Sequence, residues 1–279
     1  MLGAYPPSPG SPTWVSSDAM ADVRSPDGIR LHIDMDGSGE PITVFAHGLT
    51  NSCMELAPFT PFAPGTKVRF CFRGHGHSET PDAGRYGFSD YAGDLRTVAD
   101  GVGATRAVGT SLGAGALTRV IADDPGRFDR LVFLLPAALD EPLEGHPLSQ
   151  HTADLLETLP KDEAIRRALE DSGRGAAYAR APGLREYDLL LWQELDPVGV
   201  ARAIRGIVGE VAVDDRNRLR AVEAPALVIA REGDSLHPAW IAHAMVELMP
   251  SAELVMLASE EDLFASIPVL VERVARFLA

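Results

Sequence analysis

The residue pattern with the clearest chemical potential is the pentapeptide Gly109-Thr110-Ser111-Leu112-Gly113. A short apolar run precedes it and an apolar segment with helical spacing follows it, so Ser111 is predicted at a sharp turn from strand to helix. There its hydroxyl would project at a helix N-terminus, where the helix dipole favours developing negative charge. The two glycines leave room where a Cβ would clash. The simpler alternative is a glycine-rich turn whose serine only caps a helix.

Three further polar segments follow short apolar runs of the kind expected for buried strands. If these runs are parallel strands, the polar segments meet at the carboxyl edge of one sheet, where ligands bind in such folds. The segments are His47-Gly48-Leu49-Thr50, Arg73-Gly74-His75-Gly76-His77-Ser78 and Arg231-Glu232-Gly233-Asp234.

The elements that must position these residues alternate between strand and helix patterns. A hairpin is predicted over 20–35, around the turn Ser25-Pro26-Asp27-Gly28. Further strands are predicted at 41–46, 67–72, 107–108, 131–135, 226–230 and 254–257, and helices after Asn51 or Ser52, at Ser89, after Ser111, near Pro238 and at the C-terminus. The sequence therefore predicts an α/β fold with a mostly parallel sheet covered on both faces.

The predicted organisation is one α/β core interrupted by an insertion. Residues 1–17 are rich in proline and serine and are expected to form a disordered tail. The core is assigned to 18–135 and 223–279. Residues 136–222 show helical patterns without a clear strand, and they enter at the carboxyl edge of the sheet. They are therefore predicted to form a helical cap over the site.

The overall composition limits the classes of protein to which this chain can belong. The 279 residues are 46% hydrophobic, which suffices for a large core. A formal charge of −15 argues against nucleic acids and anionic membranes as partners. The two cysteines, Cys53 and Cys71, indicate no disulfide framework. Neither a signal peptide nor a membrane-spanning run is recognisable, so we expect a cytoplasmic protein. No motif implies a cofactor or a metal.

The four polar segments together resemble those of the α/β-hydrolase fold family, in the branch with a helical cap, from about residue 20 to 279. The resemblance implies that Ser111 is the nucleophile and that Asp234 is the acid that orients an imidazole. It also implies an oxyanion hole formed by the backbone N–H groups of Leu49 and Leu112. His47 would support the oxyanion loop, and we expect no metal at His75 and His77.

One departure from the family concerns the catalytic base. Family members place a histidine in the loop after the last strand, whereas no histidine follows His243 here. Glu260 and Glu261 stand in that region instead, and a carboxylate facing Asp234 would have a raised pKa. Alternatively, His237 could reach Ser111 from the loop of Asp234, or a cap histidine, His146 or His151, could descend over the site. A mechanism without a serine–histidine relay is the remaining possibility.

The leading interpretation is an enzyme acting on a small, largely apolar carbonyl compound such as an ester, lactone or thioester. Ser111 would be the nucleophile of a triad that lacks the usual histidine. One alternative is a cyclase, lyase or isomerase in which Ser111 and the oxyanion hole only polarise the substrate. The other is a protein that binds a small molecule without converting it. The expected partner is a small-molecule substrate, and the sequence does not fix the oligomeric state.

Overall fold

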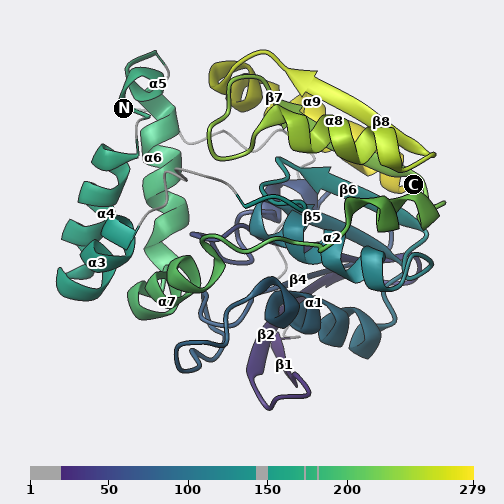
Figure 1. Cartoon of the computed structure of the whole chain (residues 1–279), viewed down its shortest axis with the longest axis horizontal. Coiled ribbons are helices and arrows are strands. Elements are labelled where there is room, and N and C mark those ends of the chain that lie inside the picture. Colours follow the sequence, from purple (N-terminus) through teal and green to yellow (C-terminus); the bar gives the residue numbers. More distant parts are fainter. Residues whose placement is uncertain (1–19, 143–149, 173, 181) are drawn as a thin grey trace.

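An eight-stranded sheet forms the centre of the molecule (Figure 1). The computed structural model describes residues 20–142, 150–172, 174–180 and 182–279, so the tail predicted for 1–17 lies outside the described residues. The strand order is β1-β2-β4-β3-β5-β6-β7-β8, and only the pairs β1–β2 and β2–β4 are antiparallel. The prediction of a mostly parallel α/β sheet is confirmed.

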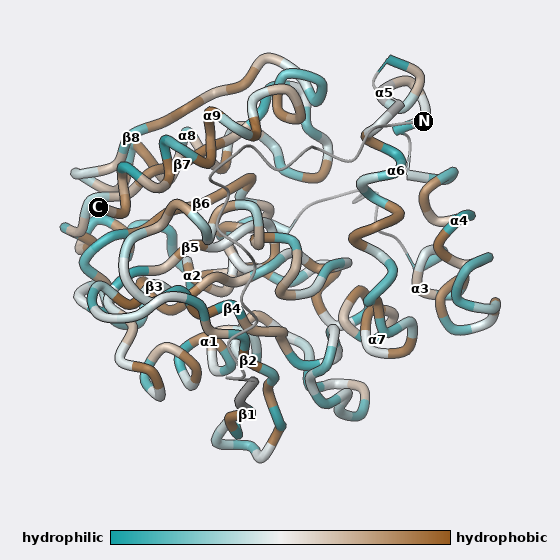
Figure 2. Tube along the Cα trace, turned by 180° about the vertical axis from the view of Figure 1, so that it is seen from behind, coloured by the Kyte–Doolittle hydropathy of each residue, from teal (hydrophilic) through white to brown (hydrophobic). Residues whose placement is uncertain are grey.

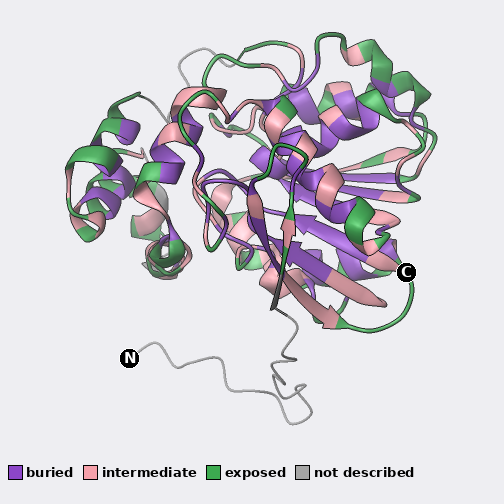
Figure 3. Ribbon diagram, turned by 90° about the horizontal axis from the view of Figure 1, so that it is seen from below, coloured by how far each residue is buried: buried purple, intermediate pink, exposed green. Residues whose placement is uncertain are grey.

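The strands lie close to their predicted positions because short apolar runs bounded by turn residues define them well. Their bounds are β1 Met20–Arg24, β2 Arg30–Gly37, β3 Ile42–Ala46, β4 Thr66–Phe70, β5 Arg106–Thr110, β6 Arg130–Leu134, β7 Ala226–Arg231 and β8 Ala252–Leu257. The central strands are almost wholly buried (Figure 3), as expected for parallel strands covered on both faces.

Each face of the sheet has its own hydrophobic core. On one face the strands pack against α1 (Phe88–Val102), α2 (Leu112–Asp123) and α8 (Ala239–Leu248). On the other, α9 (Glu260–Leu278) and the segment around Leu56 and Ala63 cover strand residues such as Val108 and Val132. Apolar stretches mark β6 and β8 in the hydropathy view (Figure 2). The expectation of a doubly covered sheet is therefore correct.

The chain between β6 and β7 forms a helical insertion, and most of its helices lie together beyond one end of the sheet (Figure 1). These are α3 Gln150–Thr158, α4 Lys161–Asp171, α5 Gly175–Arg180, α6 Pro182–Leu191, η2 Trp192–Glu194 and α7 Pro197–Ile207. The last one, η3 Arg216–Ala221, packs instead against α2 and α8 of the core. Between β6 and β7 the described residues contain no strand, in agreement with the sequence pattern. No helix among the described residues has the length and apolarity needed to span a membrane.

The helix predicted after Asn51 or Ser52 is wrong. The segment between β3 and β4 forms turns and one short 3-10 helix, η1, at Ala57–Phe59. Pro58, Pro61 and Pro64 explain the difference, because each lacks an N–H and disfavours helical backbone in the residue before it. The helix α1 begins one residue before the predicted cap Ser89, with Gly87 as its N-cap.

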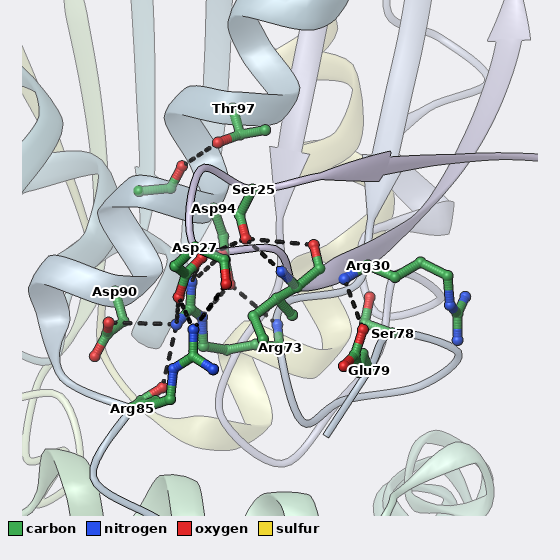
Figure 4. A network of polar contacts seen from close by, with 12 residues as sticks. Ser25, Asp27, Arg30, Arg73, Ser78, Glu79, Arg85, Asp90, Asp94 and Thr97 are labelled. Atoms are coloured by element: carbon green, nitrogen blue, oxygen red, sulfur yellow. Dashed lines mark hydrogen bonds and ion pairs between the residues drawn. The ribbon is translucent and has the colours of Figure 1, made fainter. Parts of the chain in front are cut away.

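A buried ion-pair network ties the loop after β4 to α1 (Figure 4). Arg73 is 2% exposed and binds the fully buried carboxylate of Asp94 through two nitrogens, with Nε–Oδ2 at 2.9 Å and Nη2–Oδ1 at 2.6 Å. Asp27 and Asp90 complete the surroundings of the guanidinium, at 3.0 and 3.3 Å from Nη1. The Arg-Gly-His-Gly segment is thus anchored by its arginine to the helix that packs behind it.

Asp94→Asn is expected to lower the free energy of unfolding by about 3 kcal/mol, because it removes the fully buried carboxylate that Arg73 binds through two nitrogens and leaves only the two peripheral carboxylates of Asp27 and Asp90. Asp100→Asn on the same helix is the matched control. Asp100 is 59% exposed and pairs with Arg127, so its loss should cost less than about 1 kcal/mol. Urea denaturation followed by circular dichroism measures both, and equal effects would contradict the account.

Candidate active site

Ser111 occupies the sharp turn between β5 and α2. Its backbone angles are φ 50° and ψ −109°, a strained conformation for a residue with a side chain. A Cβ on Gly109 would lie 2.6 Å from the Gly113 carbonyl oxygen, and one on Gly113 would lie 2.2 Å from the Ala46 oxygen. Both glycines are therefore required by close backbone approach, as the pentapeptide predicts. Ser111 belongs to a strained elbow, and the simpler reading of it as a helix-capping serine does not hold, since its side chain makes no capping hydrogen bond.

His237 lies against the hydroxyl of Ser111. Its Nε2 is 3.0 Å from Ser111 Oγ, and its Nδ1 is 3.0 Å from Asp234 Oδ2. The parallel register makes this possible, because Thr110 at the end of β5 pairs with Leu134 of β6, and Leu134 pairs with Ile229 of β7. The loop after β7 therefore opens beside the elbow. A serine, an imidazole and a carboxylate are in hydrogen-bond contact, in that order.

A compact turn places the imidazole of His237 against Asp234, which lies three residues earlier in the chain. Asp234 Oδ1 accepts hydrogen bonds from the backbone N–H groups of Leu236, at 2.9 Å, and His237, at 3.2 Å. Pro238 then caps α8 and ends the loop. Because the carboxylate holds both the backbone and the ring of His237, a separation of only three residues suffices for the contact.

Asp234 carries its negative charge in a largely buried position. Burial alone would raise its pKa, but His237 and the guanidinium of Arg231 outweigh that effect and hold the pKa well below its usual range. Arg231 Nη2 lies 2.6 Å from Asp234 Oδ2. The carboxylate can therefore orient the imidazole and stabilise it when it is protonated.

The two glutamates considered as substitutes for the base do not meet Asp234. Arg174 Nε lies 2.6 Å from Glu260 Oε1, and Arg231 stands between Glu260 and Asp234. Glu261 pairs with Arg180 of the insertion. The idea that like charges raise the pKa of a Glu260–Asp234 pair is therefore wrong, because an arginine separates the two carboxylates.

The described cap histidine, His151, does not supply a base in this structure. His151 is exposed on α3 and pairs with Asp171 at 3.3 Å. His146 lies outside the described residues. Among the described residues that the sequence left open as substitutes, only His237 is placed against Ser111.

The loop after β3 faces Ser111 from the other side. The N–H of Phe72 donates to His47 Nε2 at 3.0 Å, so the other ring nitrogen, Nδ1, carries the proton and donates to the Gly48 carbonyl at 2.7 Å. Burial, with a smaller contribution from His75, lowers the pKa of His47 to about 3, so the ring stays neutral. His47 thus supports the loop, as expected. The ring nitrogen Nε2 of His75 lies against the Leu49 carbonyl.

Leu49 and Leu112 both line the cavity that contains Ser111. Leu112 is the first residue of α2, so no carbonyl of its own helix can accept its N–H. The predicted oxyanion donors and the nucleophile therefore border the same space. That space measures about 510 Å³ and reaches under the helical insertion, where Tyr187, Leu191 and Trp192 contribute to its wall.

A carboxyl group that the sequence analysis missed stands at this loop. Glu55 Oε2 accepts a hydrogen bond from the Gly48 N–H at 2.6 Å, and Oε1 accepts one from Asn51 Nδ2 at 2.7 Å. Glu55 is partly exposed and lines the cavity. Burial raises its pKa to about 7, despite these two hydrogen bonds. The four-residue spacing from Asn51 is the only sequence signal that points to it.

Comparison with known proteins agrees with this geometry. The model of the alpha/beta hydrolase family matches residues 43–263, which is most of the chain. The chain belongs to this family. Among the described residues no group of histidine, cysteine and acidic side chains could hold a metal ion.

Several solved alpha/beta hydrolase structures share the fold at low sequence identity. An enol-lactonase from Burkholderia xenovorans LB400 has 21% identity and a TM-score of 0.76, covering 92% of this chain and 99% of its own. An esterase from Rhodococcus sp. ECU1013 has 21% identity and a TM-score of 0.74, with 93% and 98% covered. A hydrolase from Pseudomonas aeruginosa has 23% identity and a TM-score of 0.75, with 94% and 99% covered.

Glu55→Gln is expected to stabilise the protein in a pH-dependent way. A folded-state pKa near 7, against 4.5 for a free glutamate, means that folding opposes ionisation of this carboxyl. The carboxyl group therefore lowers the free energy of unfolding. This destabilisation is nearly absent below pH 4.5, grows as the pH rises toward 7 and is complete above pH 7. The free energy of unfolding should therefore rise by about 2 kcal/mol at pH 8 and by less than about 1 kcal/mol at pH 5.

Urea denaturation at the two pH values measures this difference. Glu194→Gln is the matched control, because Glu194 touches Ser52 of the same loop from an exposed position. If Glu55→Gln raised the free energy of unfolding equally at both pH values, or lowered it at pH 8, the burial of the Glu55 charge would be contradicted.

Proposed function

We propose that the protein hydrolyses a small, uncharged ester, lactone or thioester through an acyl-enzyme intermediate on Ser111. The observation that carries the proposal is the contact of His237 Nε2 with Ser111 Oγ at 3.0 Å, while Nδ1 of the same ring faces Asp234. This arrangement meets the requirement that a serine nucleophile have an adjacent, oriented base. The triad is then complete, with its histidine in the loop after β7.

The proposed reaction follows from the position of each group. Ser111 Oγ attacks the carbonyl carbon while His237 Nε2 takes its proton, and the imidazolium is stabilised by Asp234. The backbone N–H groups of Leu49 and Leu112 stabilise the negative charge on the carbonyl oxygen. His237 returns the proton to the leaving alcohol or thiol. It then takes a proton from water, which attacks the acyl group and releases Ser111.

The charges around the cavity favour an uncharged substrate. Each guanidinium among the described lining residues is paired with a carboxylate: Arg174 with Asp188 and Glu260, Arg180 with Glu261, and Arg231 with Asp234. No cation is therefore free among them to bind a substrate carboxylate or phosphate. The lactonase and esterase among the similar structures act on substrates of the proposed kind, according to their names.

Incubation with a fluorophosphonate probe should add one adduct to the wild-type protein, and intact mass spectrometry detects it. Ser111→Ala should give no adduct, and His237→Ala should be labelled at least about 10³-fold more slowly because the serine has lost its base. His243→Ala is the matched control, since His243 is exposed on α8, and it should be labelled at the wild-type rate.

Each departure from that result points to a different alternative. Wild-type protein that is folded but never labelled contradicts the covalent mechanism, leaving substrate polarisation or binding alone. Labelling that survives His237→Ala but not Glu260→Gln would assign the base to the loop after β8.

A further inference from the structure

The carboxyl group of Glu55 holds both ends of the turn that presents Leu49 to the active site. It accepts one hydrogen bond from the Gly48 N–H and one from the Asn51 side chain. The Asn51 N–H in turn contacts the Gly48 carbonyl at 3.3 Å. The backbone on either side of the Leu49 N–H is therefore fixed through this one side chain.

The same carboxyl group lies beside the nucleophile. A Cβ placed on Gly48 would be 3.2 and 3.3 Å from the two carboxyl oxygens of Glu55 and 3.4 Å from Ser111 Cβ. Glu55 and Ser111 thus both lie in contact distance of the same point beside Gly48. Any negative charge that develops at the oxyanion hole arises next to this carboxyl group.

We propose that Glu55 is a positioning residue that controls the oxyanion hole through its proton. The neutral carboxyl group holds the loop and permits charge to develop on the substrate oxygen. The carboxylate holds the loop equally well but repels that charge. This inference rests on the proposed acyl transfer to Ser111, and it adds a control that the triad itself does not provide.

The surroundings of Glu55 determine the pH at which its carboxyl group ionises. Burial is the main influence on its pKa, and together with the nearby carboxylate of Asp188 on α6 it raises the pKa to about 7. Asp188 is itself paired with Arg174 and with the hydroxyl of Tyr178. Tyr187, also on α6, stays neutral because burial raises its pKa to about 12. Glu55 therefore changes charge near neutral pH.

Both protonation states can keep the contacts of the loop. Asn51 Oδ1 is buried and has no hydrogen-bond partner, while Nδ2 of the same amide donates to Glu55. Turning the amide over would offer Oδ1 to a protonated Glu55 as an acceptor. A glutamine at position 55 could use the same arrangement, with its carbonyl facing Gly48 and its amine facing Asn51.

The test is the rate of fluorophosphonate labelling of Ser111 between pH 6 and pH 9, with intact mass as the readout. In the wild type the rate should fall by roughly tenfold or more with rising pH as Glu55 ionises, because like charges at this separation repel strongly. Glu55→Gln should abolish the fall. Glu194→Gln, which removes an exposed charge of η2 that contacts Ser52 of the same loop, should keep the fall.

The outcomes separate this inference from the proposed function. Labelling of the wild type with the same alkaline fall in Glu55→Gln overturns the inference alone. An equal loss of rate at every pH in a folded Glu55→Gln protein also overturns it, since that pattern shows a structural role. A wild type that is labelled at no pH overturns both proposals.

Discussion

The arrangement of the candidate active site depends on the carboxylate of Asp234. One oxygen accepts the backbone N–H groups of Leu236 and His237, and the other contacts the His237 ring and Arg231. The turn and the ring orientation therefore share one cause. With the backbone fixed in this way, the imidazole can lie only three residues from its aspartate and still direct Nε2 at Ser111.

This solution changes what the loop after β8 does. In family members that loop carries the histidine, whereas here Glu260 begins α9 and binds Arg174 of the helical insertion. Arg174 also binds Asp188, and Arg180 binds Glu261. These ion pairs join the insertion to the core at the rim of the cavity. Arg231 keeps these negative charges apart from Asp234.

Most of the fold could be predicted from the sequence, because buried strands and the glycines around Ser111 leave strong local patterns. The segment 51–65 could not be read in this way. Its caps suggested a helix, but Pro58, Pro61 and Pro64 outweighed them. The alpha/beta hydrolase resemblance located Asp234, Leu49 and Leu112 at the carboxyl edge of the sheet.

The sequence offered His237 as one of several candidate bases without singling it out, and it gave no sign of the buried acid. The placement of His237 depends on hydrogen bonds between a side chain and the backbone within one turn, which residue spacing alone does not reveal. The role of Glu55 depends on its burial in the folded protein. The sequence Met54-Glu55-Leu56 gives no indication that this carboxyl group is buried. Both features required the three-dimensional contacts.

Chemical rescue tests the central claim, that His237 is the base for Ser111, most directly. The labelling rate of His237→Gly would be measured with increasing imidazole, beside Ser111→Ala under the same conditions. The account predicts a saturable increase in rate for the glycine variant and none for the alanine variant. Wild-type labelling by His237→Gly without imidazole would contradict it.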